Sequence, residues 1–327
     1  MCRILFFIFL YTMSSAGQEL ELRQKEFYNN QFKLIQKTWN DEGYWGEALK
    51  NLDNRYNEAI LVYCKLDSCA SSENAKKIKK AIRFSFQNLQ DDTGGMLQNG
   101  KPVHVRTSLF LYGVINAISH HPKLLNNKKI HRGYQRAIKY LEKPHPFSSN
   151  HNMAAMLVMR TLYQKTCENR FLELFDMYRG IVVNSFKQQD DKFGFWPESA
   201  KKWRHRLSIP YLFVQNFFLA EYFKYYEDPN LLRLFKMQIA YLSTFVDFKR
   251  CQVDVTKSTG GFKKKGIEKV AISNYSFFTL SKSEQSSLQT IFNRTSVEFK
   301  KKALQIPYLN HTDLYFRFGL IHDETLW

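Results

Sequence analysis

The feature of the sequence that most constrains the fold is a succession of apolar segments long enough to form helices. Residues 107–118 are almost wholly apolar, which predicts a helix that is buried on all sides. Strand-like alternation is scarce, and residues 252–256 are the one short candidate for a strand. Further helices are predicted at residues 18–39, 52–63, 74–89, 131–141, 153–163, 171–186, 211–226 and 231–248. We therefore expect an all-α protein.

Turns that join glycine to an apolar or aromatic residue separate these helices. They occur at residues 43–46, 93–96, 193–196 and 260–262. Their wide spacing along the chain is typical of helical hairpins as a repeating unit. Such hairpins, stacked in a ring, would form an incomplete α/α toroid whose glycine-containing loops line a central cleft. Because no low-complexity linker interrupts the chain, residues 17–327 are expected to form a single domain and a monomer.

The first sixteen residues have the pattern of an export signal. A short basic start, Met1 to Arg3, precedes ten apolar residues, and Ser14, Ser15 and Ala16 offer a small-residue cleavage site. The apolar run is too short to span a bilayer, and no later stretch is long and uncharged enough to do so. We therefore predict a signal peptide at residues 1–16 and a secreted or periplasmic protein without a membrane partner.

The charge balance predicts a polyanionic partner. The chain has 48 Lys and Arg residues against 30 Asp and Glu, a formal net charge of +18. Nucleic acid, acidic polysaccharide or an anionic membrane surface could match this charge. Export makes nucleic acid the poorer partner and an acidic polysaccharide the better one.

Cysteine and histidine spacing gives no sign of a metal or other cofactor. Four cysteines, Cys64, Cys69, Cys167 and Cys251, would remain after signal cleavage. An even number in an exported chain suits disulfides, with three possible pairings, although four reduced thiols are the alternative. No Cys/His cluster has the spacing of a zinc site. We expect no metal and no cofactor.

Residues 193–211 hold the densest mixture of cations and aromatic rings in the sequence. Cations match the charge of an anionic ligand, and flat rings stack on sugar faces. Pro210 precedes a run expected to be helical, so Tyr211 would lie in its first turn, near the positive end of the helix. The alternative is a solvated basic loop whose aromatic rings cap the core. The candidates here are Trp196, Lys202, Trp203, Arg204, His205, Arg206 and Tyr211.

A second cluster, Ser-Ser-Asn-His-Asn at residues 148–152, stands directly before the helix predicted at residues 153–163. Asn150 or Asn152 could cap that helix. His151 would then lie at a helix N-terminus, where a surface or packing role is the alternative to a functional one.

These motifs resemble those of the helical alginate lyases, polysaccharide lyase family 5 and its relatives. Asn150 and His151, followed by an apolar helix, resemble the family's Asn-Asn-His-x-Tyr-Trp-Ala-Ala motif. The segment 194–198 resembles its Gly-Phe-x-Pro-Asn-Glu, and a basic run then leads to a tyrosine. The segment 99–106, with Lys101 and Arg106, resembles its Thr-Gly-Lys-Ser-x-Arg-Lys-Trp. The resemblance covers residues from about 45 to 226.

The sequence also departs from the family's pattern. Ser149 replaces the first Asn, and the Tyr-Trp pair after the histidine is replaced around Asn152 and Met153. Arg204 precedes Tyr211 by seven positions, as the catalytic arginine of the family precedes its tyrosine. Because the basic run needs an insertion to align, Arg206 competes with Arg204 for that role.

The resemblance implies an α/α toroid lyase that cleaves an acidic polyuronide, alginate or poly-mannuronate above all, by β-elimination. Asn150, His151 and the arginine would neutralise the uronate carboxylate, and Tyr211 would act as base and acid. Neighbouring carboxylates and sugar rings would be bound by Lys101, Arg106, Trp196, Lys202, Trp203, His205 and Arg206. The alternatives are a non-catalytic binder of acidic glycans and a glycoside hydrolase, which would need paired carboxylates.

Overall fold

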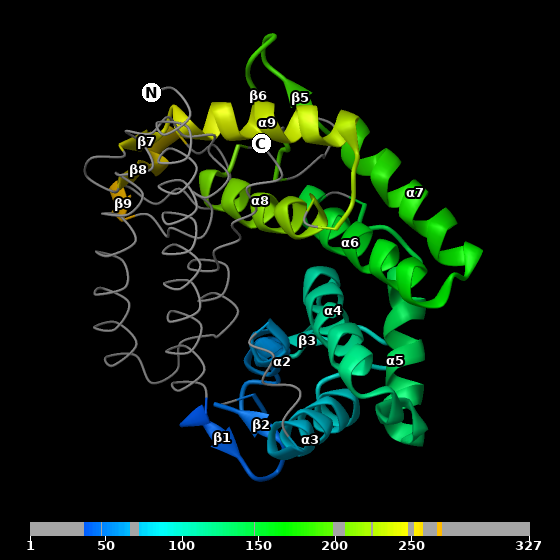
Figure 1. Cartoon of the computed structure of the whole chain (residues 1–327). Coiled ribbons are helices and arrows are strands. Elements are labelled where there is room, and N and C mark those ends of the chain that lie inside the picture. Colours follow the sequence, from blue (N-terminus) through cyan, green and yellow to red (C-terminus); the bar gives the residue numbers. More distant parts are fainter. Residues whose placement is uncertain are drawn as a thin grey trace, which may run out of the picture.

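Helices dominate the structure, a computed structural model that describes residues 36–46, 48–65, 72–146, 148–198, 207–223, 225–247, 252–257 and 267–269 (Figure 1). The predicted all-α class is confirmed. The α-helices are α2 (Ile60–Lys65), α3 (Ser72–Asn88), α4 (His104–His120), α5 (Lys128–Leu141), α6 (Ser149–Thr166), α7 (Asn169–Asn184), α8 (Ile209–Phe223) and α9 (Pro229–Ser243). Short 3-10 helices are η1 (Asn54–Ala59), η3 (Pro122–Asn126) and η4 (Val255–Lys257).

Local sequence explains why some helices are buried on most sides and others on one side only. In α4 most side chains are buried, as the apolar run predicts. In α5 the buried residues recur at helical spacing, at Ile130, Tyr134, Ala137 and Leu141, while lysines and arginines occupy the other face. Asn127 caps α5 by accepting hydrogen bonds from two backbone N–H groups of the first turn, which would otherwise lack partners.

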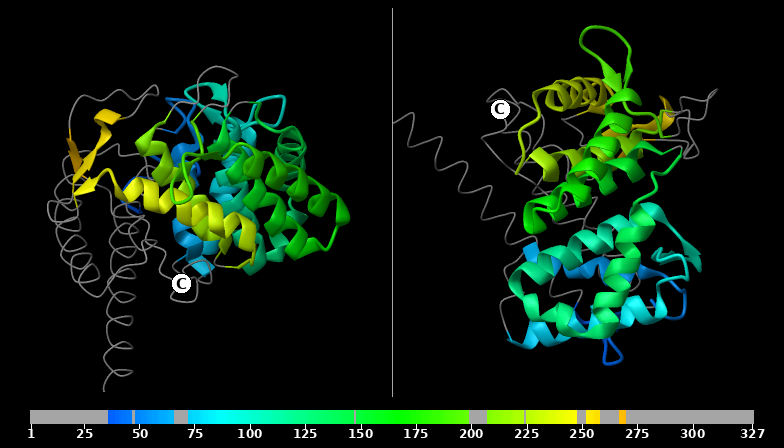
Figure 2. Two further views of the ribbon diagram at one scale, coloured as in Figure 1. Left: turned by 90° about the horizontal axis from the view of Figure 1, so that it is seen from above. Right: turned by 90° about the vertical axis from the view of Figure 1, so that its right-hand side faces the viewer.

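The helices lie in an arc with an inner and an outer row. Along the inner row α2 packs on α4, α4 on α6, and α6 on α8. The helices α3, α5, α7 and α9 each follow an inner helix, pack on it and lie on its outer side (Figure 1). The right-hand view in Figure 2 shows the blue-to-teal helices at one end and the green and yellow helices at the other.

A two-stranded hairpin precedes three of the inner helices. The pairs are β1 (Trp39–Asn40) with β2 (Tyr44–Trp45), β3 (Leu97–Gln98) with β4 (Lys101–Pro102), and β5 (Lys187–Gln188) with β6 (Gly194–Phe195). The hairpins β1–β2 and β5–β6 include the predicted glycine-containing turns at 43–46 and 193–196, and β3–β4 directly follows the one at 93–96; the fourth, 260–262, lies outside the described residues. Gly94 shows why glycine is needed: its φ is +98°, and a Cβ would lie 2.2 Å from the carbonyl oxygen of Arg136.

A further small sheet contains the strand predicted at residues 252–256. It consists of β7 (Val246–Asp247), β8 (Gln252–Asp254) and β9 (Ile267–Lys269), in antiparallel pairs. The strand ends earlier than predicted, because η4 begins at Val255.

Several predictions fall on residues outside the described part of the chain. These are the signal peptide at residues 1–16, and Lys202, Trp203, Arg204, His205 and Arg206. Cys69 and Cys251 also lie outside it, so the pairing of the cysteines stays open. Within the described residues, no helix combines the length and the apolar character required to cross a bilayer.

Candidate functional site

Three histidines come together where α4 and α6 begin. His104 is the first residue of α4, His151 lies in the first turn of α6, and His145 lies in the loop between α5 and α6. The ring centroids of His145 and His151 are 4.3 Å apart, and each lies 5.9 Å from that of His104. Of the three, only His151 was a candidate from the sequence.

The contacts of His104 determine which of its ring nitrogens carries the proton. Its Nε2 lies 3.1 Å from the Tyr178 hydroxyl and 3.2 Å from the Lys143 carbonyl oxygen. The Tyr178 hydroxyl donates its proton to the carbonyl of Leu141 at 2.6 Å, so both neighbours of Nε2 are acceptors. Neutral His104 therefore carries its proton on Nε2, and Nδ1 is left as an acceptor. This Nδ1 is buried and makes no hydrogen bond within the described residues.

Asn152 holds the loop that carries His145. Its carboxamide oxygen accepts a hydrogen bond from the backbone N–H of His145 at 2.9 Å, and its NH2 donates to the carbonyl of His145 at 3.0 Å. The predicted cap by Asn150 or Asn152 is wrong, because both lie inside α6 and the N-cap position belongs to Ser148. Asn152 instead joins the first turn of α6 to the preceding loop.

Burial and neighbouring charge keep the histidine cluster, His104, His145 and His151, uncharged at neutral pH. Burial, followed by the charges of His145, His104 and Arg106, lowers the pKa of His151 well below its usual value. Burial and the charge of His145 lower the pKa of His104 to about 4. Burial also lowers the pKa of His145. A neutral imidazole has one N–H donor and one acceptor nitrogen.

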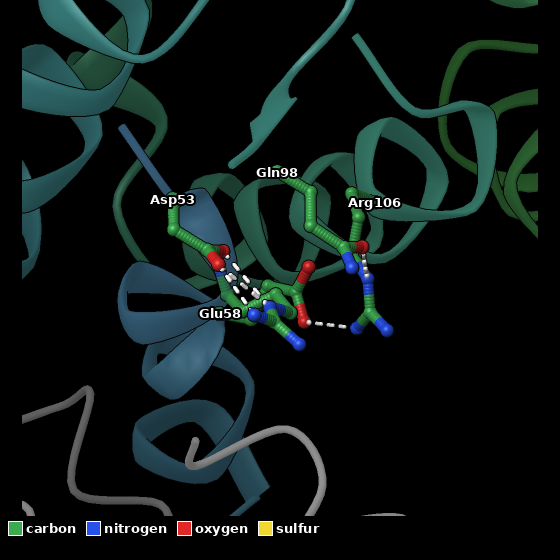
Figure 3. Close-up of polar contacts among 5 residues, drawn as sticks. Asp53, Glu58, Gln98 and Arg106 are labelled. Carbon is green, nitrogen blue, oxygen red and sulfur yellow. Dashed lines mark hydrogen bonds and ion pairs between the residues drawn. The ribbon is translucent and has the colours of Figure 1, made fainter. Parts of the chain in front are cut away.

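Arg106 lies close enough for its charge to act on His151, and two side chains hold it in place. Its Nε donates to Gln98 of β3 at 2.9 Å, and its Nη1 pairs with Glu58 of η1 at 3.2 Å (Figure 3). Its side chain is 13% exposed, and its Nη2 makes no hydrogen bond within the described residues. Asp53 orders the start of η1 by binding Arg55. The guanidinium of Arg106 is thus held in place, and its Nη2 is left to donate a hydrogen bond to an anion.

Lys101 lies on the same hairpin as the residue that holds Arg106. It is exposed on β4, and its backbone pairs with that of Gln98. Two of the predicted carboxylate-binding side chains are therefore presented by one hairpin and the first turn of α4.

Asn150 is buried in the first turn of α6, one residue before His151. Its carboxamide oxygen accepts a hydrogen bond from the hydroxyl of Ser148. Its NH2 group makes no hydrogen bond to a residue that the structure describes. The donor that the predicted role of Asn150 requires is therefore not used within the fold.

A chain of hydrogen bonds joins the start of α6 to α8. Ser149 donates to the carbonyl of Pro197 at 2.9 Å, and Gln215 of α8 donates to the carbonyl of Trp196 at 3.2 Å. Tyr211 precedes Gln215 by four residues and lies on the same face of α8. This brings the helix face of Tyr211 toward the segment that contacts the start of α6. The convergence of its hydroxyl with Asn150 and His151 stays a prediction.

The ring of Trp196 is placed in the core and has no face open to a sugar. It is completely buried, its Nε1 donates to the carbonyl of Val182 at 2.7 Å, and Phe186 packs edge-on at 4.6 Å. The stacking role predicted for Trp196 is therefore replaced by the alternative, a packing role. Its backbone still links β6 to α8 and α9, since its N–H donates to Gln238.

The sequence did not single out His104, His145 or Tyr178, and it suggested only a capping role for Asn152. Their shared signal is weak: His104 and His145 stand close to predicted helix starts, like His151. Within the described residues, no group of three or more His, Cys, Asp and Glu side chains is arranged to hold a metal ion.

Comparison with models of known protein families and with curated proteins finds no match for this chain.

Proposed function

We propose that the protein is an exported polysaccharide lyase that cleaves an acidic polyuronide, with alginate or poly-mannuronate as the leading substrate, by β-elimination. The observation that supports the proposal is neutral His151 within reach of the charge of Arg106, a guanidinium held by Glu58 and Gln98. Asn150, whose NH2 is unused within the described residues, directly precedes His151. We further infer that the arc of helices is an incomplete α/α toroid with its catalytic end where α4, α6 and α8 begin.

The reaction needs hydrogen-bond donors directed at the carboxylate of the uronic acid. A uronate lyase removes the proton at C5 and expels the oxygen at C4. That proton is weakly acidic while the adjacent carboxylate is ionised, so donors aimed at the carboxylate stabilise the negative charge that develops. Asn150, neutral His151 and Arg106 can each supply an N–H. In this proposal Arg106 binds the carboxylate through Nη2, while Glu58 and Gln98 keep the guanidinium in position.

Tyr211 acts as the base and then as the acid that protonates the leaving oxygen. A free tyrosine has a pKa of about 10, so about one in a thousand is ionised at pH 7. A cation within hydrogen-bond range lowers such a pKa by about 1–3 units, and Arg204 or Arg206 is the candidate for that cation. A shift of two units would raise the phenolate fraction about a hundredfold.

The proposal is tested with poly-mannuronate, poly-guluronate, glucuronan and glycosaminoglycans as substrates. The double bond of the unsaturated product absorbs in the ultraviolet, so a lyase gives a rise in absorbance. Tyr211→Phe should abolish this rise, because phenylalanine cannot move a proton, while circular dichroism stays that of a folded helical protein. No rise on any substrate would refute the lyase, and full activity of the variant would remove Tyr211 from its role.

A non-catalytic binder of acidic glycans is the second candidate. It is favoured by the residues that stand where the lyase family has its Tyr-Trp pair, because Met153 and Ala154 are both buried and offer no ring to a sugar. Salt-sensitive retention on an alginate column without product formation would support this candidate. Hydrolysis products that lack the double bond would instead support a glycoside hydrolase.

A further inference from the structure

The outer helices differ sharply in charge. The neighbouring helices α3 and α5 together carry ten Lys and Arg side chains and one acid, a formal charge of +9 against +18 for the whole chain. The outer helix α7 carries two cations and two acids and is neutral. The charge of the protein is therefore concentrated on one part of the outer row.

Most of the Lys and Arg side chains of α3 and α5 face solvent and have no acidic partner among the described residues. Lys77 and Arg136 are half-buried and pair with Glu73 and Asp92. The other eight are exposed and form no salt bridge with a described residue: Lys76, Lys79, Lys80, Arg83, Lys128, Lys129, Arg132 and Lys139. Like charges four residues apart, such as Lys76 and Lys80, destabilise a helix slightly, and a bound anion would relieve this repulsion.

We propose that these eight residues, the cationic face of α3 and α5, dock an acidic polysaccharide chain outside the catalytic end of the molecule. This inference rests on the proposed function for the class of ligand. It adds a second contact region, on the outer row, to the site at the start of the inner helices.

The chemistry of the face favours a polysaccharide over a membrane or a nucleic acid. The apolar side of each helix is buried in the core, so no amphipathic side remains for insertion into a bilayer. The large hydrophobic side chains that are exposed among the described residues, Leu49, Leu52, Met177 and Tyr225, all lie on other elements. Within the described residues, the face thus has no exposed Phe, Tyr or Trp ring on which unpaired bases could stack. Lysine predominates, and it acts as a point charge toward dispersed carboxylates.

The cationic face leads toward the histidine cluster. Lys139 lies in the last turn of α5, and Lys143 follows shortly after the helix ends. The carbonyl of Lys143 contacts His104. A polyanion held along α5 would therefore be guided toward the start of α4 and α6.

Two variants with equal loss of charge test the docking face. One carries K76Q, K80Q, K129Q and R132Q on the cationic face; the control carries K165Q, K192Q, R233Q and K257Q, four exposed cations elsewhere. Both are made in full-length protein with Tyr211→Phe, so that the matrix is not cleaved. Affinity for immobilised poly-mannuronate is measured at low salt. We expect it to fall about tenfold for the face variant and less than twofold for the control.

The outcomes separate this inference from the lyase proposal. Equal affinity of the two variants would overturn the docking face, even if unsaturated product forms. Selective loss in the face variant would support it, even if no substrate is cleaved. Duplex DNA or phosphatidylserine vesicles that compete as strongly as soluble poly-mannuronate would overturn the assignment to polysaccharide.

Discussion

His104 shows how burial determines the charge of a single residue in this protein. It is 5% exposed, and both groups beside its Nε2 are acceptors. Protonation of Nδ1 would place a positive charge in the core, next to two further imidazoles. This is why the pKa of His104 is lowered to about 4, and why its imidazole is neutral at neutral pH.

The depressed pKa of His104 predicts an acid-sensitive fold. In the unfolded chain the pKa of histidine is about 6.5, so the unfolded chain binds one more proton than the folded one between pH 6.5 and about 4. His104 therefore contributes stability that is fully present above pH 6.5 and falls by about 1.4 kcal/mol per pH unit below it. In His104→Gln the slope of unfolding free energy against pH, measured with urea, should decrease by this amount. His131→Gln, exposed on α5, is the matched control, and an unchanged slope in His104→Gln would contradict the prediction.

At the scale of elements, side-chain to backbone hydrogen bonds join the helices to the segments between them. Asn152 binds both backbone groups of His145, and Ser149 binds the carbonyl of Pro197. The first turn of α6 therefore organises both the loop before it and the segment before α8. This explains why polar residues gather at 148–152 although none of their side chains caps the helix.

Loss of the Asn152 contacts should destabilise the junction of α6 with its preceding loop. Asn152→Ala leaves two backbone groups of His145 without their partners, and we expect the free energy of unfolding in urea to fall by about 1–2 kcal/mol. Asn126→Ala, at an exposed asparagine of η3, is the control and should be near neutral. The same loss in both variants, or none in Asn152→Ala, would show that these hydrogen bonds do not hold the loop.

At the scale of the whole molecule, the packing of the helices determines where the positive charge is exposed. The inner helices bury apolar sequence, and among the described residues the exposed cations are concentrated on α3 and α5, in a chain whose net charge is +18. With an isoelectric point of about 9.5, the protein stays positive at neutral pH. Its encounter with a polyanion is therefore expected to be electrostatically steered.

Steering of this kind predicts a strong dependence on ionic strength. The Debye length falls from about 30 Å at 0.01 M salt to about 8 Å at 0.15 M, which screens exposed charges that act over a distance. In the ultraviolet assay, KM for a polyuronide should rise steeply with sodium chloride while kcat changes little. A KM that is independent of salt would mean that the surface charge plays no part in substrate capture.

Helix positions could be predicted from the sequence because the apolar period of a helix is a local property. All eight predicted helices within the described residues are present, and residues 18–39 lie almost wholly outside them. The hairpins β1–β2, β3–β4 and β5–β6 were predicted only as turns, since strands of two residues are too short to show alternation. The sequence left both a stacking and a packing role open for Trp196, because a tryptophan after a glycine turn has the same sequence signal whether it faces the core or a ligand.

What the sequence by itself determined is the helical class, the excess of positive charge and the position of His151 at the start of a helix, since each depends on composition or on neighbouring residues. Only the tertiary structure decided that His104 and His145 stand beside His151, that Glu58 and Gln98 hold Arg106, and that Trp196 is buried. The physical reason is separation along the chain: Glu58 and Arg106 are 48 residues apart, and packing of the inner helices brings them together.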